Sequence, residues 1–153
     1  MSAEETAEAG AAAEQAPEAH SAGRSEHGAT MAAISRRIVH LLKEYYGKGP
    51  TKARSYHWGE LVVVLLRGGF TRAEKTLLEE GRARAVIEQR AELQDLMRPR
   101  FKRVIEEELN REVIAFMSAN HHDPDFNAEI FILARLPGEN GLDATAEEAD
   151  EGS

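Results

Sequence analysis

The sequence predicts an α+β fold, in which a small antiparallel four-stranded sheet, made of two hairpins, packs with helices in the order α-β-β-α-α-β-β. Three observations lead to this prediction. A helical stripe of apolar residues at 31–46 comes before the first strand-like segments. The apolar run 61–66 leads through two glycines into a helix-start signal. Two further strand-like segments, 112–119 and 129–135, follow a long helical region.

The first helix is expected over residues 31–46, where large apolar side chains recur at helical spacing. Gly47 is a suitable C-cap, and Pro50 prevents the helix from resuming. A strand at residues 52–58 then joins the apolar strand through a tight turn at residues 59–60, which gives a hairpin.

The apolar strand leads into a capping box, in which the side chains of Thr71 and Glu74 satisfy free backbone N–H groups of a first helical turn. A short helix is therefore expected at about 72–79. Gly81 separates it from a long helix at about 82–109, whose apolar residues follow one face.

The long helix contains Pro99 in its interior. Proline has no N–H and its ring clashes with the preceding turn, so we expect the helix to be kinked near this position or to restart there. Asn110 can end the helix in the left-handed conformation.

The closing hairpin combines strands at 112–119 and 129–135 with a loop, 120–127, that is full of turn-forming residues. Segments 61–66 and 130–134 are apolar at every position, so we place them in the centre of the sheet. Helices on one face of so small a sheet leave the other face exposed. Either the first helix crosses to cover it or a second copy does, so we expect a homodimer.

Both ends of the chain are acidic and are predicted to be disordered tails, at 1–30 and 137–153, around a folded domain at 31–136. Residues 1–30 contain no aromatic residue and no Leu, Ile or Val, so they cannot offset their ordering entropy. The tails carry net charges of −5 and −6, and the whole chain carries −8, which leaves +3 on the domain. The acidity therefore belongs to the tails.

The chain contains no cysteine, which excludes disulfides and thiolate chemistry. No apolar stretch approaches the roughly 20 residues that a membrane-spanning helix needs. The N-terminus lacks the basic and apolar regions of a secretory signal. We therefore expect a cytoplasmic protein that does not insert directly into a membrane.

The junction at residues 68–69 is a candidate anion site, because free N–H groups at a helix N-terminus attract negative charge and Arg67 lies beside it. A plain strand-to-helix turn needs the same glycines, and Glu74 repels anions. His121 and His122 are metal-type ligands, but no regular ligand spacing accompanies them. A solvated loop is the preferred interpretation, and no metal site is expected.

Arg54, Tyr56 and Trp58 share one face of the first strand. Such a face can stack single-stranded nucleic acid. The domain's charge of +3 is low for that purpose. We therefore expect Tyr56 and Trp58 to pack under a helix, and we favour this packing over nucleic-acid binding. Cysteine nucleophiles, GxSxG and HExxH are absent from the sequence, so we expect neither an enzyme nor a cofactor.

One pattern extends through residues 31–135: a helix, the segment GKGP, Arg54-x-Tyr56, an apolar strand, Gly69-x-Thr71-x-x-Glu74-x-x-Leu77, Arg82 and Arg90 ahead of Arg98-Pro99, and a closing hairpin. This pattern resembles the MpsC-like family, a bacterial family named for a sodium-translocating, membrane-potential-generating system. Positions that match the family, with open roles, are Gly49, Pro50, Arg54, Tyr56, Thr71, Glu74, Arg82 and Arg90.

The resemblance implies a non-enzymatic accessory or regulatory subunit that docks on a membrane-protein partner in an ion or inorganic-carbon transport system. Two alternatives stay open. One is a small-anion or nucleotide sensor, and the other is a weak nucleic-acid-binding domain. The candidate ligand-binding residues are Arg54, Tyr56, Arg67, Thr71, Glu74 and Arg90.

Overall fold

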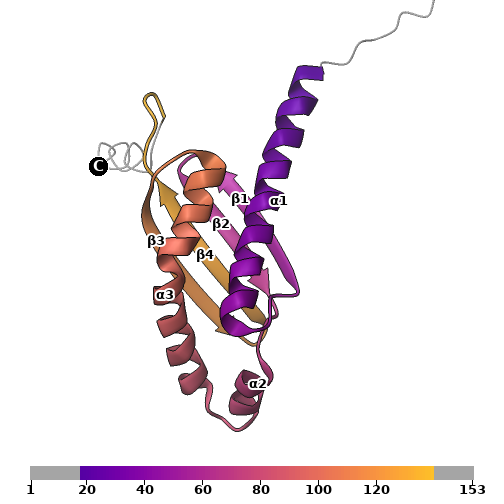
Figure 1. Ribbon diagram of the computed structural model, residues 1–153, viewed down its shortest axis with the longest axis vertical. Coiled ribbons are helices and arrows are strands. Elements are labelled where there is room, and N and C mark those ends of the chain that lie inside the picture. Colours follow the sequence, from indigo (N-terminus) through magenta and orange to yellow (C-terminus); the bar gives the residue numbers. More distant parts are fainter. Residues whose placement is uncertain (1–17, 140–153) are drawn as a thin grey trace, which may run out of the picture.

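The computed structural model of the protein describes residues 18–139 and has the predicted α+β architecture (Figure 1). Its elements are α1 (Glu18–Tyr46), β1 (Lys52–Trp58), β2 (Leu61–Arg67), α2 (Arg72–Glu79), α3 (Ala83–Leu109), β3 (Val113–His122) and β4 (Asp125–Leu133). Their order is the predicted α-β-β-α-α-β-β. No helix in this part of the chain is long and apolar enough to cross a membrane.

The four strands form one antiparallel sheet in the order β1-β2-β4-β3. The strands that contain the two apolar runs, β2 and β4, lie in the centre as predicted, and they pair with each other from Leu61↔Ile132 to Arg67↔Phe126. The first hairpin pairs Trp58 with Leu61 across the predicted turn. The sheet therefore joins the two hairpins through their most apolar strands.

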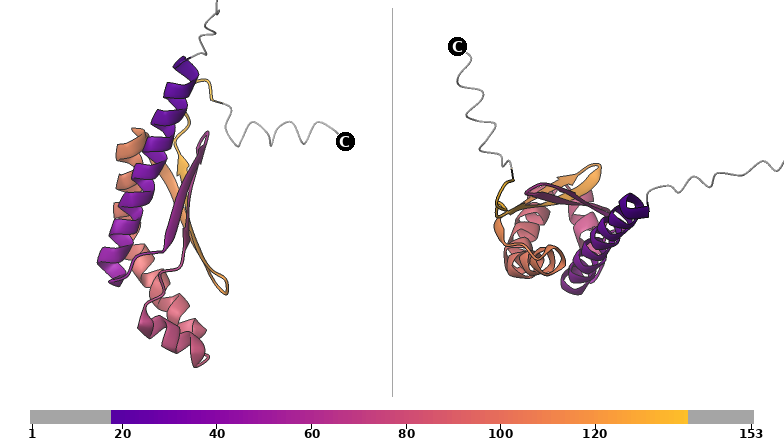
Figure 2. Two further views of the ribbon diagram at one scale, coloured as in Figure 1. Left: turned by 90° about the vertical axis from the view of Figure 1, so that its right-hand side faces the viewer. Right: turned by 90° about the horizontal axis from the view of Figure 1, so that it is seen from above.

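Helices α1 and α3 both pack on the same face of the sheet, while α2 lies beyond its lower end (Figures 1 and 2). The covered face and the two helices enclose the core, which includes Ile34, Ile38, Val62, Val64, Leu66, Met97, Phe101, Ile105, Phe131 and Leu133. A hydrogen bond of 2.8 Å between the hydroxyls of Ser35 and Ser55 joins α1 to β1.

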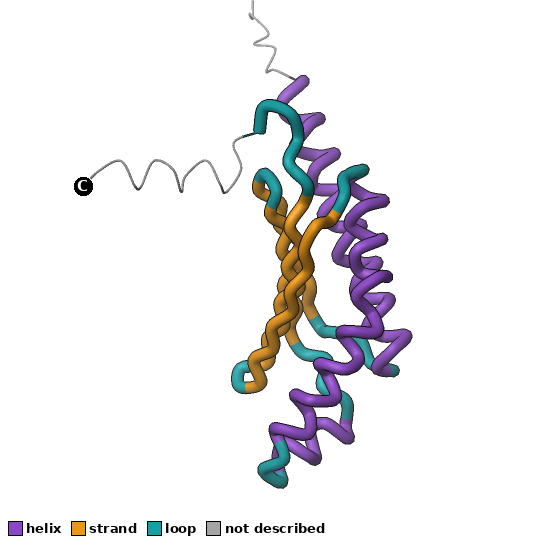
Figure 3. The backbone as a smooth tube through the Cα atoms, turned by 90° about the vertical axis from the view of Figure 1, so that its left-hand side faces the viewer, coloured by secondary structure: helices purple, strands orange, loops and turns teal. Residues whose placement is uncertain are grey.

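The other face of the sheet has no described element against it, as the side view in Figure 3 shows. The sequence left open whether the first helix crosses to this face, and it does not. We call this surface the uncovered face. It consists of the outward-facing side chains of residues 52–58, 61–67, 115–121 and 126–132, and it includes exposed Trp58, Leu65 and Met117.

Helix α1 begins at Glu18, well before the predicted start at residue 31. Residues 18–30, which were assigned to a disordered tail, are therefore helical. One contact supports part of this extension, because the His27 ring stacks on His57 of β1 with centroids 5.7 Å apart. The remaining tail positions, 1–17 and 140–153, lie outside the described residues.

The closing hairpin has a much shorter connection than the predicted loop at 120–127. Strand β3 continues to His122 and β4 begins at Asp125, so only Asp123 and Pro124 form the turn. The pairs Asn120↔Asn127 and His121↔Phe126 belong to the ladder. Turn-forming residue types suggested a loop here, but cross-strand pairing overrides that preference.

The predicted helix boundaries hold at α2 and α3. Helix α2 covers residues 72–79, and α3 ends at Leu109, followed by Asn110 as the C-cap in the left-handed conformation, with φ 50°. Helix α3 passes through Pro99 as one element and does not restart there. The prediction that Tyr56 and Trp58 pack under a helix is wrong, because the helices cover the opposite side of β1 and leave Trp58 60% exposed.

Candidate functional site

The sheet separates the six candidate residues into two groups. Thr71, Glu74 and Arg90 meet near the lower end of the covered face, where α2 and α3 approach each other. Arg54, Tyr56 and Arg67 belong to the uncovered face, on β1 and β2. A single ligand site made of all six is therefore not present.

The first group begins at the junction between β2 and α2, where two consecutive glycines have positive φ values. A Cβ on Gly68 would lie 2.5 Å from the Thr51 hydroxyl oxygen, and one on Gly69 would lie 3.2 Å from the Cα of Pro50. Only glycine combines this backbone conformation with such close neighbours. The connector at residues 49–51 therefore packs against the junction.

The capping box at the start of α2 is formed as predicted. The Glu74 N–H donates to the Thr71 hydroxyl at 3.1 Å, and the Thr71 N–H donates to the Glu74 carboxylate at 3.0 Å. The carboxylate thus occupies the position that an anion would take at this helix N-terminus. This arrangement disfavours the anion site that the sequence suggested here.

Glu74 also forms a buried ion pair with Arg90 of α3, and their side chains are 2% and 9% exposed. Arg90 Nε donates to one carboxylate oxygen at 2.6 Å and Nη2 donates to the other at 3.3 Å. The guanidinium lies over the Phe70 ring, 4.3 Å from its centroid, and Tyr46 lies on it at 5.3 Å. Two nitrogens of this arginine are therefore committed to Glu74 between aromatic rings.

The pKa of Glu74 reflects two opposing effects. Burial raises it, but the hydrogen bonds from Arg90 and from Thr71 outweigh burial, so the pKa lies below its ordinary value. Glu74 is therefore ionised at neutral pH. Burial raises the pKa of the neighbouring Tyr46 to about 12, so its phenol stays neutral.

A polar network continues from this pair along β4. The Gln94 amide donates to Asn120 at 3.3 Å and to Asn127 at 3.4 Å, and Asn120 donates back to Gln94 at 3.2 Å. Asn127 in turn donates to Glu129 Oε1 at 2.7 Å. These contacts join α3 to both strands of the closing hairpin.

Glu129 is the most unusual member of this network, because its side chain is fully buried in the sheet. Burial raises its pKa to about 7, although the interactions with Ser118 and Asn127 and the charge of Arg90 act in the opposite direction. The Ser118 hydroxyl of β3, its cross-strand neighbour, is the other polar side chain that acts on this carboxyl group. Glu129 therefore titrates near neutral pH and not in the acid range of an ordinary glutamate.

A small cavity lies beside the ion pair, between Tyr46, the residues 68–69 and Arg90. Its volume of about 20 Å³ is sufficient for one water molecule and for nothing larger. The buried cluster therefore has the geometry of a structural core element. It holds α2, α3 and β4 together rather than offering room for a substrate.

The second group of candidates has a different setting. Tyr56 stacks on Trp58, with ring centroids 5.4 Å apart, next to exposed Arg54. The Arg67 guanidinium lies over Phe126 at 5.3 Å. Aromatic rings and arginines thus share the uncovered face, where no described element shields them.

The histidine pair of the closing hairpin does not form a ligand cluster. The His121 and His122 rings lie 6.2 Å apart, and His121 Nδ1 contacts the Pro124 carbonyl oxygen at 2.7 Å. Within residues 18–139 no three His, Asp or Glu side chains are arranged to hold a metal ion.

Sequence reasoning missed the partner of Glu74 and the whole network around Glu129. A signal existed for each. Arg90 follows Val86 by four residues and precedes Met97 by seven, so it falls on the apolar stripe of α3. Glu129 alternates with Phe131 on the buried face of β4. A charged residue at a core position is the pattern that points to a buried pair.

Comparison with protein-family models places most of the chain within one family description. The family model described as Na+-translocating membrane potential-generating system (MpsC) matches residues 26–135. Neither a curated protein nor a solved structure matches the chain. The matched residues extend from α1 to the end of β4 and so include both groups of candidate residues.

Proposed function

This chain belongs to the MpsC family, and on that premise we propose that it is a non-enzymatic accessory or regulatory domain of a membrane ion or inorganic-carbon transport system. In this proposal the domain acts in the cytoplasm as a homodimer. The family's description supports a role beside a system that generates a membrane potential. No helix within residues 18–139 can cross a membrane, so these residues would act on subunits that do.

The observation that carries this proposal is the uncovered face. Three of its large apolar side chains, Trp58, Leu65 and Met117, are 60%, 37% and 50% exposed. Half-buried Val63 and Ile130 lie between them in the register of the sheet. A contiguous apolar surface of this kind is typical of an interaction site.

A second copy of the chain is the occupant that we assign to this face. Cationic Lys52 and Arg54 lie toward one end of β1, and the Tyr56–Trp58 stack lies toward the other. A two-fold axis in the interface and perpendicular to the strands places the cations of one copy against the aromatic rings of its partner. Like charges then lie at opposite ends of the dimer.

The remaining chemistry supports a binding role in preference to catalysis. The Glu74 and Arg90 side chains are engaged with each other, and the cavity beside them holds no more than one water. A catalytic acid or base needs a reachable substrate position within hydrogen-bond distance. Burial of Glu129 leaves no such position.

Sedimentation equilibrium tests the homodimer. We expect the wild-type chain to associate, and Leu65→Lys combined with Met117→Lys to remain monomeric, because two ammonium groups would have to be buried. Ile87→Lys is the matched control, since Ile87 is 49% exposed on α3, away from the uncovered face. A monomeric wild type, or equal association of all variants, would refute the dimer.

Crosslinked affinity capture from native cells, read by mass spectrometry, tests the accessory role. We expect an integral membrane ion or bicarbonate transporter to be recovered with the wild-type chain. Recovery of the chain alone, in cells that express the transport system, would contradict the accessory role while leaving the dimer intact.

Binding of single-stranded nucleic acid is a second candidate function, and one observation favours it. Exposed Trp58 and half-buried Tyr56 lie beside Arg54, which is the composition of a stacking platform. Fluorescence anisotropy with labelled oligo(dT) and oligo(U) tests it at low and high salt. Binding that Trp58→Ala abolishes would support this function, and no binding at low salt would exclude it.

A further inference from the structure

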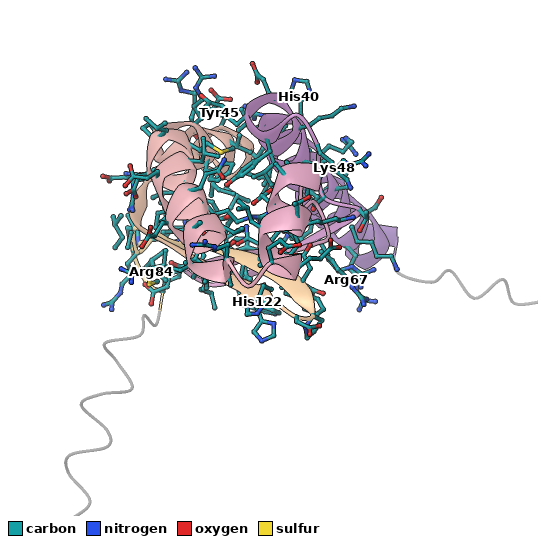
Figure 4. The ribbon with its side chains drawn as sticks, turned by 90° about the horizontal axis from the view of Figure 1, so that it is seen from below. His40, Tyr45, Lys48, Arg67, Arg84 and His122 are labelled. Atoms are coloured by element: carbon teal, nitrogen blue, oxygen red, sulfur yellow. The ribbon has the colours of Figure 1, made fainter. Side chains whose placement is uncertain are left out.

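A groove runs between α1 and α3 on the side of the helices that faces away from the sheet. Figure 4 shows His40 and Tyr45, which border this region, on that side of the molecule. The groove has a volume of about 630 Å³. Arg36, Arg37, Arg100 and Arg103 line it, and we call it the arginine groove.

Apolar side chains line the groove between these arginines. Val104 is almost fully buried, Leu41 is half-buried, and Leu96 is 67% exposed. A large aliphatic side chain exposed to this degree in a groove gains free energy when an apolar ligand covers it. The arginine groove thus combines a cationic rim with an apolar floor.

The cationic character of the rim is only partly neutralised within the domain. Arg37 forms ion pairs with Glu107 and Glu108, the latter at 2.9 Å. Arg36, Arg100 and Arg103 have no ion-pair partner among residues 18–139.

No Asp or Glu is among the described residues that line the groove. Arg100 contacts the Tyr45 ring at 5.3 Å, and this contact orients the guanidinium without neutralising it. The groove therefore favours an anion.

We propose that the arginine groove binds an anionic phospholipid at a membrane surface. Guanidinium groups match phosphate oxygens in paired hydrogen bonds, so Arg36, Arg100 and Arg103 hold the headgroup phosphate. The acyl chain lies on the apolar floor at Leu96. The groove volume falls in the ordinary range for small-molecule sites.

The chain's own acidic segments match the cationic rim of the groove but not its apolar floor. Residues 1–30 contain no aromatic residue and no Leu, Ile or Val, and residues 137–153 contain only Leu142 as a large apolar residue. They offer carboxylates but little to cover the floor. An amphiphile supplies both parts, which is why a lipid is assigned here.

The net charge of the whole chain restricts the part of its surface that can approach an anionic membrane. A chain of net charge −8 is repelled from an anionic membrane as a body. Attraction must therefore come from a local cationic surface within a Debye length of the lipid headgroups. The proposal goes beyond the accessory role and does not depend on the homodimer.

Vesicle flotation with the full chain tests the proposal. The vesicles contain phosphatidylcholine alone or phosphatidylcholine with phosphatidylglycerol at a 7:3 ratio. We expect binding only to the second kind, and binding at least about 30-fold weaker for Arg100→Glu combined with Arg103→Glu, because each lost arginine removes about 1 kcal/mol of attraction and each new carboxylate adds repulsion. Leu96→Ser should weaken binding several-fold with all charges kept.

The matched control is Arg72→Glu combined with Arg82→Glu, which reverses two exposed arginines that form no ion pair among residues 18–139 and do not line the groove. Its binding should change much less than that of the groove variant. Equal losses in both double variants would overturn the proposal, because general charge would then explain binding. Circular dichroism of each variant confirms that the helices are kept.

Two further outcomes overturn the lipid assignment. One is the absence of binding to phosphatidylglycerol vesicles at low salt. The other is complete competition by a few millimolar inorganic phosphate, which would show that the rim takes a free anion and that the floor contributes nothing. Insensitivity to phosphate, with loss of binding at high salt, is the expected result.

A vesicle-clustering assay distinguishes a failure of the lipid proposal from a failure of the homodimer proposal. A dimer joined through the uncovered faces carries its two arginine grooves on opposite outer sides, so it should cluster phosphatidylglycerol vesicles and raise their turbidity. Leu65→Lys with Met117→Lys should keep flotation and lose clustering. Flotation without clustering in the wild type supports the lipid site and counts against the dimer.

Discussion

The two faces of the sheet use the same strands but differ in what covers them. On the covered face Val64 and Phe131 are fully buried against α1 and α3. On the uncovered face their chain neighbours Leu65 and Ile130 are exposed or half-buried. A strand that is apolar on both faces predicts two covers, and the described residues supply one. The contrast is the reason that we propose the uncovered face as an association surface.

The faces also differ in how they treat charge. Arg90 of the covered side is paired with Glu74 between aromatic rings. Arg54 of the uncovered face has no ion-pair partner in the described part of the chain. Substitutions on the covered side should therefore change the free energy of unfolding, whereas those on the uncovered face should change binding.

The largest contrast is expected between adjacent residues of β4. Phe131→Ala should lower the free energy of unfolding by about 3 to 5 kcal/mol, because it leaves a cavity in the core. Ile130→Ala, on the uncovered face, should cost about 1 kcal/mol in the monomer. Urea unfolding at low protein concentration measures both, and equal costs would contradict the assignment of the two faces.

Removal of one partner from the buried ion pair should have a comparable effect. Glu74→Ala leaves the Arg90 guanidinium buried and unpaired, so we expect a loss of about 3 to 5 kcal/mol. Glu74→Leu combined with Arg90→Met should recover much of that loss, since both charges are then removed. Glu88→Ala, which breaks the exposed pair with Arg84, should cost less than about 0.5 kcal/mol.

Glu129 should make the stability of the covered side depend on pH. Its folded pKa of about 7 lies above the ordinary value of 4.5, so its contribution is fully present below about pH 4.5 and is lost as the pH rises through 7. At pH 8, Glu129→Gln should exceed the wild type in stability by on the order of 3 kcal/mol. At pH 4 the two should be nearly equal.

Urea unfolding of both proteins from pH 4 to pH 8 checks this prediction. The difference between the wild type and Glu129→Gln isolates the one carboxyl group, because all other titrating groups are shared. Glu74 has a lowered pKa, so its contribution to the stability of the protein is lost in the acid range instead. That loss is common to both proteins. A difference that does not change with pH would mean that Glu129 is solvated.

The smallest effect concerns the capping box at the edge of the covered face. Thr71→Ala removes the acceptor for the Glu74 N–H and should cost about 1 kcal/mol. Thr76→Ala, in the middle of the same helix, is the matched control and should be neutral or slightly stabilising, since alanine has the higher helix propensity. Thermal unfolding of the two variants distinguishes these outcomes.

Local signals in the sequence were sufficient for much of the fold. The Thr71 and Glu74 spacing identified the start of α2, and the unbroken apolar runs placed β2 and β4 in the centre of the sheet. These features depend on residues close together in the chain. They could therefore be derived from periodicity and capping chemistry alone.

The candidate site depended on contacts between distant residues, and these were not available from the sequence. Glu74 and Arg90 are 16 residues apart, and α2 and α3 must fold back before the two meet. The arginine groove needs Arg36 of α1 beside Arg100 of α3. The side of the sheet that each helix covers was open as well, because both arrangements bury the same stripe.

Fluorescence of Trp58, the only tryptophan in the chain, tests the central claim that a second copy covers the uncovered face. The measurement is its emission maximum and its quenching by acrylamide, taken from nanomolar to high micromolar protein concentration. A covered face predicts a blue shift and reduced quenching as concentration rises, and loss of both changes in Leu65→Lys combined with Met117→Lys. Emission typical of an exposed indole at every concentration would contradict the claim.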